Sequence, residues 1–434
     1  MEASRPTDAL RAAARRFGTP AYVTSVEALE AAAGMLRDAF PDPWLSAYSV
    51  KANDVPAIVG RLGAAGLGAN VVSSGEWAAA RAAGIPNDRV TLEGIGKTTA
   101  DLRAAVRASV DGRPLRWVAI ESPEELDELA ALATRAGLGG KQRPPIDVLF
   151  RLNPDVMPET HASLAVGRGS SKFGMTETEL TAAVAGLPED GPVRARGIHL
   201  HVGSQLGAVD AWRDAVRRGL ALLALIGAGR DGFDTFDVGG GFPVGDPGTV
   251  PTPEHFGREV RALVEALPAD RRPARLAVEP GRFLVAQAGW LVARVLHVRE
   301  RSDAERIVVL DAGMTELIRP ALYDATHPIS ALTSLGRLLD ADGRAPDGTI
   351  VEATAARVDG PICESTDTFD RHRLPPLRRG DLVAIGEAGA YAASMAMTYN
   401  GRPGPSQVLL EADGTLRLGR RRTTSPFRSR GMTG

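Results

Sequence analysis

The hydrophobic positions of this chain alternate between short apolar runs and longer amphipathic stretches over most of its first two thirds. We predict eight strands, at residues 45–51, 67–72, 90–93, 116–120, 146–152, 197–202, 234–238 and 275–279. Helices are predicted between most of them, at residues 55–65, 75–83, 98–109, 123–136, 177–186, 208–227 and 254–267. Eight strands that alternate with helices over about 230 residues predict a (β/α)8 barrel, a fold of typically ~250 residues.

The pattern changes on both sides of this barrel. Before it, residues 5–17 predict an amphipathic helix, residues 19–24 a strand, and an Ala-rich stretch a helix that ends near Phe40. After Arg282, Gly, Pro and Asp separate β-rich segments at residues 284–299, 306–311, 350–358, 381–385 and 406–418. We therefore predict an α/β fold: a TIM barrel plus a mostly antiparallel β-domain, built from the N-terminal strand and the C-terminal third.

The predicted domain limits follow from these changes of pattern. Residues 1–27 are assigned to the N-terminal segment of the β-domain, residues 28–283 to the barrel, and residues 284–419 to the rest of the β-domain. Residues 420–434 contain five arginines and no acidic residue. We expect them to form a basic, disordered tail.

Composition narrows the classes of function. The 434 residues are 44% hydrophobic and carry a formal net charge of −2, which favours no special affinity for nucleic acid or membranes. No apolar run is long enough to span a bilayer, and the first residues begin no apolar signal region. The single cysteine, Cys363, excludes intrachain disulfides and a multi-cysteine metal site. We expect a cytoplasmic protein.

Lys51 is the first candidate for chemistry. It ends the predicted strand that begins at Leu45, and the loop residues Asn53 and Asp54 follow closely. The carboxyl ends of barrel strands point toward the face where active sites form. Desolvation there can leave a nucleophilic amine, as a Schiff base requires. Taken alone, however, a solvent-exposed lysine is the commoner outcome, by about 5 to 1.

Glycines and histidines follow two later strands. Gly239, Gly240 and Gly241 allow either a close approach to an anion such as phosphate or a plain tight turn. His199 and His201 could hold zinc, but no third ligand has fitting spacing, and we expect no metal. We interpret His199 as a core histidine satisfied by a backbone partner, and His201 as a ring that stacks on a flat cofactor.

Charged and polar residues complete the candidates. A buried Glu279 at the barrel mouth needs a cation, such as a protonated pyridine nitrogen. Arg282 offers a fork for a carboxylate or phosphate, although the two residues could simply pair with each other. The later candidates are not informative one by one, because each has a plain structural explanation. They are Arg319, Tyr323, Cys363, Glu364 and Tyr391.

The motifs are specific when they are taken in order. They run YSVKAN, SSKFGM, HVGSQ, DVGGGFP, EPGR, RPALY, CESTD and GAYAASMAMTYNGRP. This series resembles the fold-type III, pyridoxal-phosphate-dependent decarboxylases of basic amino acids, and most of all the diaminopimelate decarboxylases. The resemblance runs from about residue 15 to residue 412.

The resemblance implies roles for the candidate residues. Pyridoxal 5'-phosphate would be the cofactor, bound by Lys51, His201, Ser204, Gly239, Gly240, Gly241, Glu279, Gly281, Arg282 and Tyr391. The substrate would be bound by Arg282, Arg319, Tyr323, Glu364 and Tyr391. Lys51, which forms the Schiff base, and Cys363, which delivers a proton to Cα, would be catalytic. The Cys-Glu segment would reach into the neighbouring subunit, which implies a homodimer with shared active sites.

The expected reaction is the decarboxylation of meso-2,6-diaminopimelate to L-lysine. Its distal carboxylate suits Arg282 and Arg319, and its distal amine suits Glu364. The chain departs from the family pattern at Asn70, at Thr91–Lys97 and in the sequence NGRPGP. Alternatives therefore stay open: another amino acid (ornithine- or arginine-like, carboxynorspermidine, or carrier-tethered), a racemase, or a non-catalytic homologue that binds the cofactor.

Overall fold

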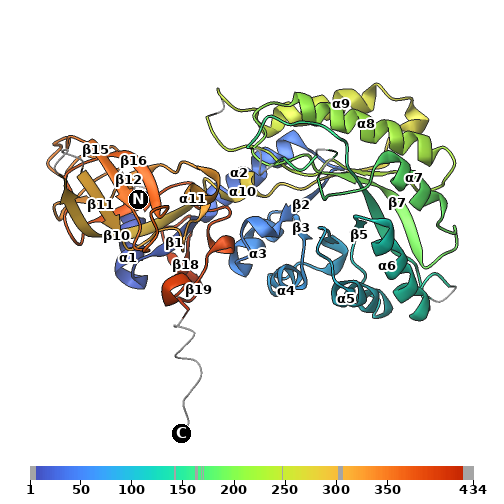
Figure 1. Ribbon diagram of the computed structural model, residues 1–434, viewed down its shortest axis with the longest axis horizontal. Helices are drawn as coiled ribbons and strands as arrows, with labels where there is room; N and C mark the ends of the chain where they lie inside the picture. Colours follow the sequence, from blue (N-terminus) through green and yellow to red (C-terminus); the bar gives the residue numbers. More distant parts are fainter. Residues whose placement is uncertain are drawn as a thin grey trace, which may run out of the picture. The chain divides into compact units, whose positions relative to one another are not determined.

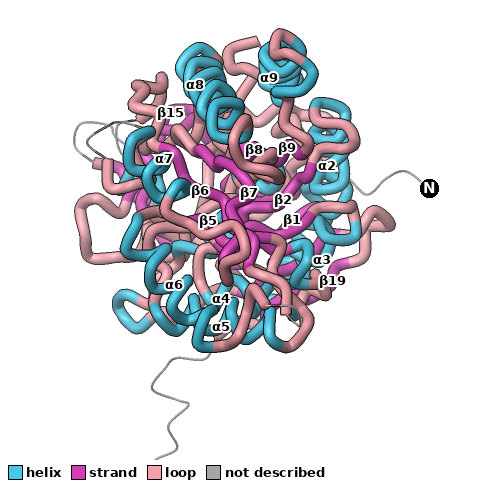
Figure 2. The backbone as a smooth tube through the Cα atoms, turned by 90° about the vertical axis from the view of Figure 1, so that its right-hand side faces the viewer, coloured by secondary structure: helices cyan, strands magenta, loops and turns pink. Residues whose placement is uncertain are grey.

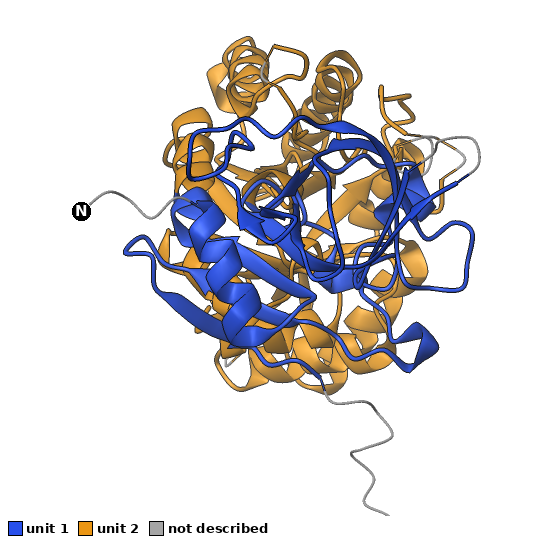
Figure 3. Ribbon diagram, turned by 90° about the vertical axis from the view of Figure 1, so that its left-hand side faces the viewer, with its two compact units in different colours: residues 1–30, 285–434 blue, residues 31–284 orange. Residues whose placement is uncertain are grey.

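The computed structural model describes residues 6–140, 143–161, 165–167, 169, 171–246, 248–301 and 306–423. The chain forms two compact units, of which residues 31–284 make one and residues 1–30 with 285–434 make the other. Figure 3 colours them orange and blue. The domain limits proposed from the sequence, which divide the chain after residues 27 and 283, stay a prediction beside this division.

The unit of residues 31–284 is the predicted barrel. Eight strands pair in chain order into a closed, parallel barrel, in which Leu45 of β2 pairs with Ala277 of β9. Their buried faces carry apolar side chains such as Val118, Phe150 and Phe236. The strands are β2 (Leu45–Ser49), β3 (Gly68–Val71), β4 (Val90–Leu92), β5 (Trp117–Ile120), β6 (Ile146–Leu152), β7 (Val193–Leu200), β8 (Thr235–Asp237) and β9 (Arg275–Val278).

Helices surround these strands (Figure 2). Several begin where a Ser or Thr accepts a hydrogen bond from the backbone three residues on, as Thr98 does from Asp101 and Thr176 from Glu179. The helices are α2 (Val26–Ala39), α3 (Pro56–Ala64), α4 (Ser74–Ala82), α5 (Thr99–Val110), α6 (Pro123–Arg135), α7 (Glu177–Ala185), α8 (Asp210–Gly227) and α9 (Pro253–Glu265). Each predicted helix of the barrel is found, with its ends shifted by a residue or two.

The first strand is shorter than predicted. It ends at Ser49, and Lys51 lies in a 3-10 helix, η1 (Val50–Ala52). The backbone leaves the strand because the Ser49 amide donates to the Pro280 carbonyl at 3.0 Å and the Asn53 amide donates to the Val50 carbonyl at 3.0 Å. Lys51 therefore follows the carboxyl end of β2 within a tight turn. Further 3-10 helices are η2 (Asn87–Arg89), η4 (Ala269–Arg271), η5 (Ala393–Met395) and η6 (Tyr399–Gly401).

The other unit is the predicted β-domain. Its N-terminal strand β1 pairs antiparallel with β10 and parallel with β18, and helix α1 packs Leu10 and Ala13 into the same core as Val292 and Val408. The mixed α/β fold class is thus confirmed. The elements are α1 (Pro6–Phe17), β1 (Ala21–Ser25), β10 (Gly289–Glu300), β11 (Arg306–Leu310), α11 (Arg319–Tyr323), β12 (Ile329–Ala331), β13 (Thr333–Ser334), β14 (Arg337–Leu338), β15 (Thr354–Asp359), β16 (Thr368–Leu374), β17 (Leu382–Ile385), β18 (Ser406–Leu410) and β19 (Leu416–Arg420). Helix α10 (Arg282–Val285) spans the boundary, and its first three residues belong to the barrel unit.

The C-terminal tail is described only in part. Arg420, its first residue, ends β19 and pairs with Gln407 of β18, whereas residues 424–434 lie outside the described residues. In the part of the chain that the structure covers, none of the helices has the length and apolar character needed to cross a membrane.

Candidate active site

A cavity of about 400 Å³ opens at the carboxyl ends of the barrel strands. Three residues predicted from the sequence line it: Lys51 after β2, His201 after β7 and Glu279 after β9. The barrel topology brings them together although they are far apart in the chain. Other lining residues were not predicted, and they include Glu93, Arg151 and Phe173.

His201 is neutral in this setting. Its Nδ1 accepts a hydrogen bond from the Gly240 amide at 3.2 Å, so the ring proton lies on Nε2. Burial, and then the charge of Lys51, hold the pKa of His201 well below its ordinary value. A neutral, half-buried ring on the cavity wall suits stacking against a flat group.

His199 differs from the expectation. Neither ring nitrogen has a hydrogen-bond partner among the described residues, so the predicted backbone partner is not found. Instead Nε2 lies 3.5 Å from a carboxylate oxygen of Glu93 and 3.4 Å from one of Glu279. Burial lowers the pKa of His199 to about 4, and the ring is therefore neutral at pH 7. One ligand atom from each of these three residues lies within 4.8 Å of the others, a group that does not include His201.

The three glycines fit a close approach of strand ends. A Cβ added at Gly239, Gly240 or Gly241 would overlap the carbonyl oxygen of Leu200, Glu279 or Gly203, respectively. Gly239 and Gly241 also have φ of +69° and +108°, which other residues rarely adopt. The turn must therefore be glycine.

Ser204 and Arg282, which lie far apart in the sequence, contact each other. The Arg282 guanidinium donates to the Ser204 hydroxyl from Nη2 at 3.2 Å and from Nε at 3.4 Å. Arg282 is buried at the start of α10. A buried cation and a hydroxyl in contact form a polar pair that can bind an anion. Gly281 is packed tightly, since an added Cβ would lie 3.0 Å from the Cβ of Ser49.

Sequence reasoning missed a buried ion pair at this end of the barrel. Arg151 of β6 contacts Glu121, which follows β5, at 2.5 Å, and its guanidinium lies 4.7 Å from the Phe173 ring centroid. Burial alone would raise the pKa of Glu121, but Arg151 outweighs it and holds that pKa below its ordinary value. The signal was an arginine inside the apolar run IDVLFRL, because a buried arginine requires an anionic partner.

The remaining predicted residues belong to the other unit and are described within it. Arg319 begins α11 and donates to Nε2 of His327 at 3.0 Å, while Nδ1 of His327 donates to the Gly386 carbonyl at 3.0 Å. Tyr323 ends the same helix and is half-buried. Tyr391 follows a glycine and alanine and has a φ of 55°.

Cys363 and Glu364 share one loop environment. Cys363 is exposed, and its sulfur lies 3.5 Å from Nδ2 of Asn400. Glu364 accepts a hydrogen bond from the Tyr399 hydroxyl at 2.7 Å. The segment NGRPGP therefore contacts the Cys-Glu segment, a link that their spacing in the sequence does not reveal.

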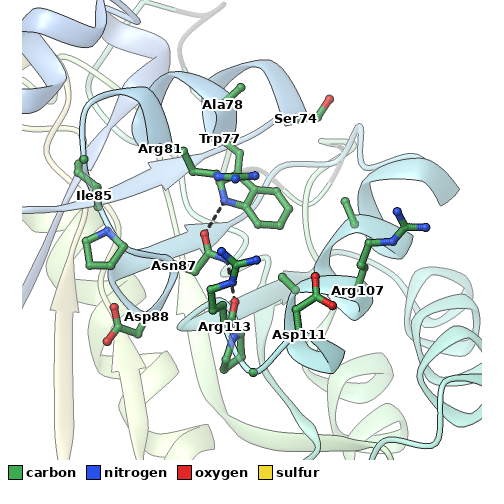
Figure 4. Close-up of a pocket in the computed structure, with 16 residues that line it drawn as sticks. Ser74, Trp77, Ala78, Arg81, Ile85, Asn87, Asp88, Arg107, Asp111 and Arg113 are labelled. Atoms are coloured by element: carbon green, nitrogen blue, oxygen red, sulfur yellow. Dashed lines mark hydrogen bonds between the residues drawn. The ribbon is translucent and has the colours of Figure 1, made fainter.

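A larger hollow of about 800 Å³ lies elsewhere on the barrel (Figure 4). Helices α4 and α5 and the loops before β4 and β5 form it, and none of the predicted site residues lines it. Asn87 bridges its walls, accepting from the Trp77 indole at 3.0 Å and donating to the Arg113 carbonyl at 2.7 Å. Loops before barrel strands lie at the end opposite to the catalytic face.

Comparisons with known proteins agree with this geometry. A family model described as "Pyridoxal-dependent decarboxylase, pyridoxal binding domain" matches residues 26–286. The diaminopimelate decarboxylase of Deinococcus radiodurans is 36% identical over 416 residues, covering 96% of each chain. That of Zymomonas mobilis is 34% identical over 418 residues, covering 94% of this chain and 92% of that protein.

Solved structures lead to the same family. Diaminopimelate decarboxylase from Helicobacter pylori, complexed with L-lysine, matches with a TM-score of 0.83 at 29% identity, over 95% of this chain and 96% of that one. The enzyme from M. jannaschii, in co-complex with L-lysine, matches with a TM-score of 0.84 at 29% identity, over 96% and 92%. The family resemblance inferred from the motifs is therefore confirmed: this chain belongs to the pyridoxal-dependent decarboxylases.

Proposed function

We propose that this chain decarboxylates meso-2,6-diaminopimelate to L-lysine and CO2. The observation that carries the proposal is similarity over nearly the full length to diaminopimelate decarboxylases, at 34–36% identity. The cavity with Lys51, His201 and Glu279 on its wall supports it, because these are the side chains that the family motifs single out.

The cofactor is pyridoxal phosphate, as for the family. Three features of the barrel unit fit it: the glycine turn with its backbone amides, the Arg282–Ser204 pair, and a buried Glu279 that no arginine or lysine pairs with among the described residues. A protonated ring nitrogen would supply that missing cation. Lys51, His201, Ser204, Glu279, Arg282, Tyr391 and the glycines 239–241 and 281 would hold the cofactor. Once bound, it would accept the electron pair that the loss of CO2 leaves.

The chain's own residues would position the substrate and move its proton. Arg319, held by His327 at 3.0 Å, would receive the distal carboxylate together with Arg282 and Tyr323. Glu364 would receive the distal amine. The Cys363 thiol, within reach of the Asn400 amide, would deliver a proton to Cα.

The assembly and location are parts of the same proposal. Because the Cys-Glu segment in this family serves a neighbouring subunit, we infer a homodimer with shared active sites. Lysine binding in the solved relatives supports a small-molecule amino-acid substrate. A cytoplasmic location stays a prediction, supported by the presence of one cysteine in 434 residues.

One observation favours a second candidate, a decarboxylase of the same fold with another amino-acid substrate. Gly94, Ile95 and Gly96 line the cavity, whereas the family pattern has His-Gly-Asn-Asn in this segment. An apolar side chain there offers a substrate no hydrogen bond. This candidate predicts CO2 release from a compound other than meso-diaminopimelate.

A substrate panel with a paired variant tests the proposal. CO2 release is measured with meso-diaminopimelate, lysine, ornithine, arginine and carboxynorspermidine, and meso-diaminopimelate should be preferred. Arg319→Ala should raise KM for it by about 10- to 100-fold, since a charge-assisted hydrogen bond is worth ~1.5–3 kcal/mol. Arg417→Ala, which alters the exposed β19, is the control and should change nothing. A preference for another compound would contradict the proposed substrate and support the second candidate.

A further inference from the structure

Three buried carboxyl groups gather beside the candidate active site. Glu93 follows β4, Asp237 ends β8 and Glu279 follows β9, and each is at most 5% exposed. A carboxylate oxygen of Glu93 and one of Glu279 lie within 4.8 Å of each other, and Nε2 of His199 lies 3.5 Å from Glu93 and 3.4 Å from Glu279. Two carboxyl groups can hydrogen-bond to each other only if one of them carries a proton. Buried carboxylates this close repel each other unless a proton or a cation lies between them.

The groups around the cluster do not neutralise it. His199 of β7 is neutral at pH 7, because burial lowers its pKa to about 4. Arg151 of β6 is paired with Glu121, which follows β5, at 2.5 Å. Lys51 after β2 is the other cation that acts on His199, and Asn70 of β3 contributes only an uncharged amide.

Glu279 is the acceptor at the centre of the cluster. The Asn70 amide donates to one of its oxygens. Burial, followed by the charge of Glu279, raises the pKa of Glu93 to about 8. The same two causes, in the same order, raise the pKa of Asp237 well above its ordinary value. Near pH 7 Glu93 is therefore a neutral acid with an O–H that it can donate to Glu279.

We propose that Glu93 is a positioning residue, which in its protonated form donates a hydrogen bond to the Glu279 carboxylate and fixes it for the ring nitrogen of the cofactor. The role of Glu279 in this statement rests on the proposed function. The proton on Glu93 rests on the cluster alone.

A metal ion is the competing occupant of this place. Glu93, His199 and Glu279 offer ligand atoms within 4.8 Å of one another. The setting favours a proton, because burial and the charge of Glu279 raise the pKa of Glu93 to about 8, and Asn70 already donates to one oxygen of Glu279. An N–H donor and a cation compete for the same oxygen lone pairs.

The first test uses the full chain without cofactor. Between the ordinary pKa of 4.5 and about 8, the folded state holds a proton on Glu93 that the unfolded state has lost. Stability from this proton is complete below pH 4.5 and is lost as pH rises toward 8. The unfolding constant of the wild type should therefore rise by up to about tenfold per pH unit relative to that of Glu93→Gln. Equal pH slopes for the two proteins would overturn the proposal. Glu265→Gln, on the exposed end of α9, is the matched control and should follow the wild type.

The second test measures the dissociation constant of pyridoxal phosphate from its visible absorbance. Glu93→Gln keeps an N–H donor toward Glu279 and should bind within about threefold of the wild type. Glu93→Leu lacks a donor and should bind about tenfold more weakly. Equal weakening in both variants would show that Glu93 acts through charge, and wild-type binding by Glu93→Leu would remove its role; either result overturns the proposal.

Metal analysis tests the metal alternative, and the cofactor-free measurement keeps the proposal testable if a variant fails to fold. A stoichiometric divalent metal in the purified wild type that Glu93→Gln loses would make Glu93 a ligand and overturn the proposal. If Glu93→Leu does not fold, the difference between the wild type and Glu93→Gln in the pH dependence of unfolding still tests the proposal. A wild type that binds no pyridoxal phosphate would defeat the proposed function, while the cofactor-free test would still report on the proton.

Discussion

At the scale of single residues, Lys51 lies in a 3-10 helix just after a barrel strand, and its charge affects the pKa values of neighbouring side chains. It lies in a tight turn between two fully buried neighbours, Val50 and Ala52. Its charge helps to lower the pKa values of both His199 and His201. Glu76 feels the same charge, although burial is the larger effect and raises the pKa of that carboxyl. Burial is the main cause of both lowered pKa values, and the charges of Lys51 and Arg151 add to it.

Lys51→Ala should abolish covalent attachment of the cofactor. The chain has four lysines, at positions 51, 97, 141 and 172, so the attachment point can be mapped without ambiguity. After reduction with borohydride, mass spectrometry should find pyridoxal phosphate on the peptide with Lys51. The Lys51→Ala variant should show neither this adduct nor the visible absorbance of the bound cofactor. Lys172→Ala, at an exposed position, is the control. An adduct on another lysine in the wild type would contradict the assignment.

At the scale of elements, the turn after β8 sets how closely the strand ends meet. The Glu279 amide donates to the Gly239 carbonyl at 2.9 Å, and the Gly239 amide donates to Asp237 at 2.9 Å. Any side chain at Gly240 would push against the Glu279 backbone. Since Glu279 belongs to the carboxyl cluster, the turn and the cluster are mechanically linked.

Gly240→Ala should therefore destabilise the protein and weaken cofactor binding together. Overpacking of this kind costs about 1–3 kcal/mol, which thermal or urea unfolding measures directly. Gly34→Ala is a matched control, because Gly34 lies inside α2 with no neighbour within 4 Å of an added Cβ. That change should stabilise the protein by up to ~1 kcal/mol, since alanine is the better helix former. Wild-type stability in Gly240→Ala would contradict the close contact.

The helices and strands also show which parts of the fold can be predicted from local sequence patterns. Each barrel strand and helix was predicted because apolar periodicity and capping residues are local signals. Strand β16 was missed because its sequence, TFDRHRL, is mostly polar, with Phe369 and Leu374 buried and Asp370 and Arg373 exposed. Its place is set by pairing with β15, which no local pattern encodes. Likewise, the spacing of Glu93 and Glu279 gives no sign of their contact, which only barrel closure creates.

At the scale of the whole molecule, the chain leaves the β-domain after β1, forms the barrel, and returns at β10. The cofactor candidates lie almost entirely in the barrel unit. Arg319, Tyr323, Cys363, Glu364 and Tyr391 lie in the other unit, whose strands β10, β11, β15 and β16 are labelled in Figure 1. The residues proposed for the site therefore come from both units, and in the proposed dimer they would come from different chains.

Mixing two inactive variants tests this sharing. Lys51→Ala disables the barrel part of a site, and Cys363→Ala disables the β-domain part. In a mixed dimer with shared sites, one site combines both defects and the other combines both intact parts. Random assembly makes half of the dimers mixed, so about a quarter of the wild-type activity should return.

The control for this mixing experiment uses two variants from one unit. Lys51→Ala and His201→Ala both damage the barrel part, so every site in their mixed dimer keeps one defect, and activity should not return. Recovery is measured as CO2 release after co-refolding, with the residual activity of each variant alone subtracted. If Lys51→Ala with Cys363→Ala recovers no more than this control pair, each chain completes its own site and the shared arrangement is wrong. Recovery in the first pair alone requires that Cys363 of one chain serve the Lys51 of another, because no other combination supplies both groups to one site.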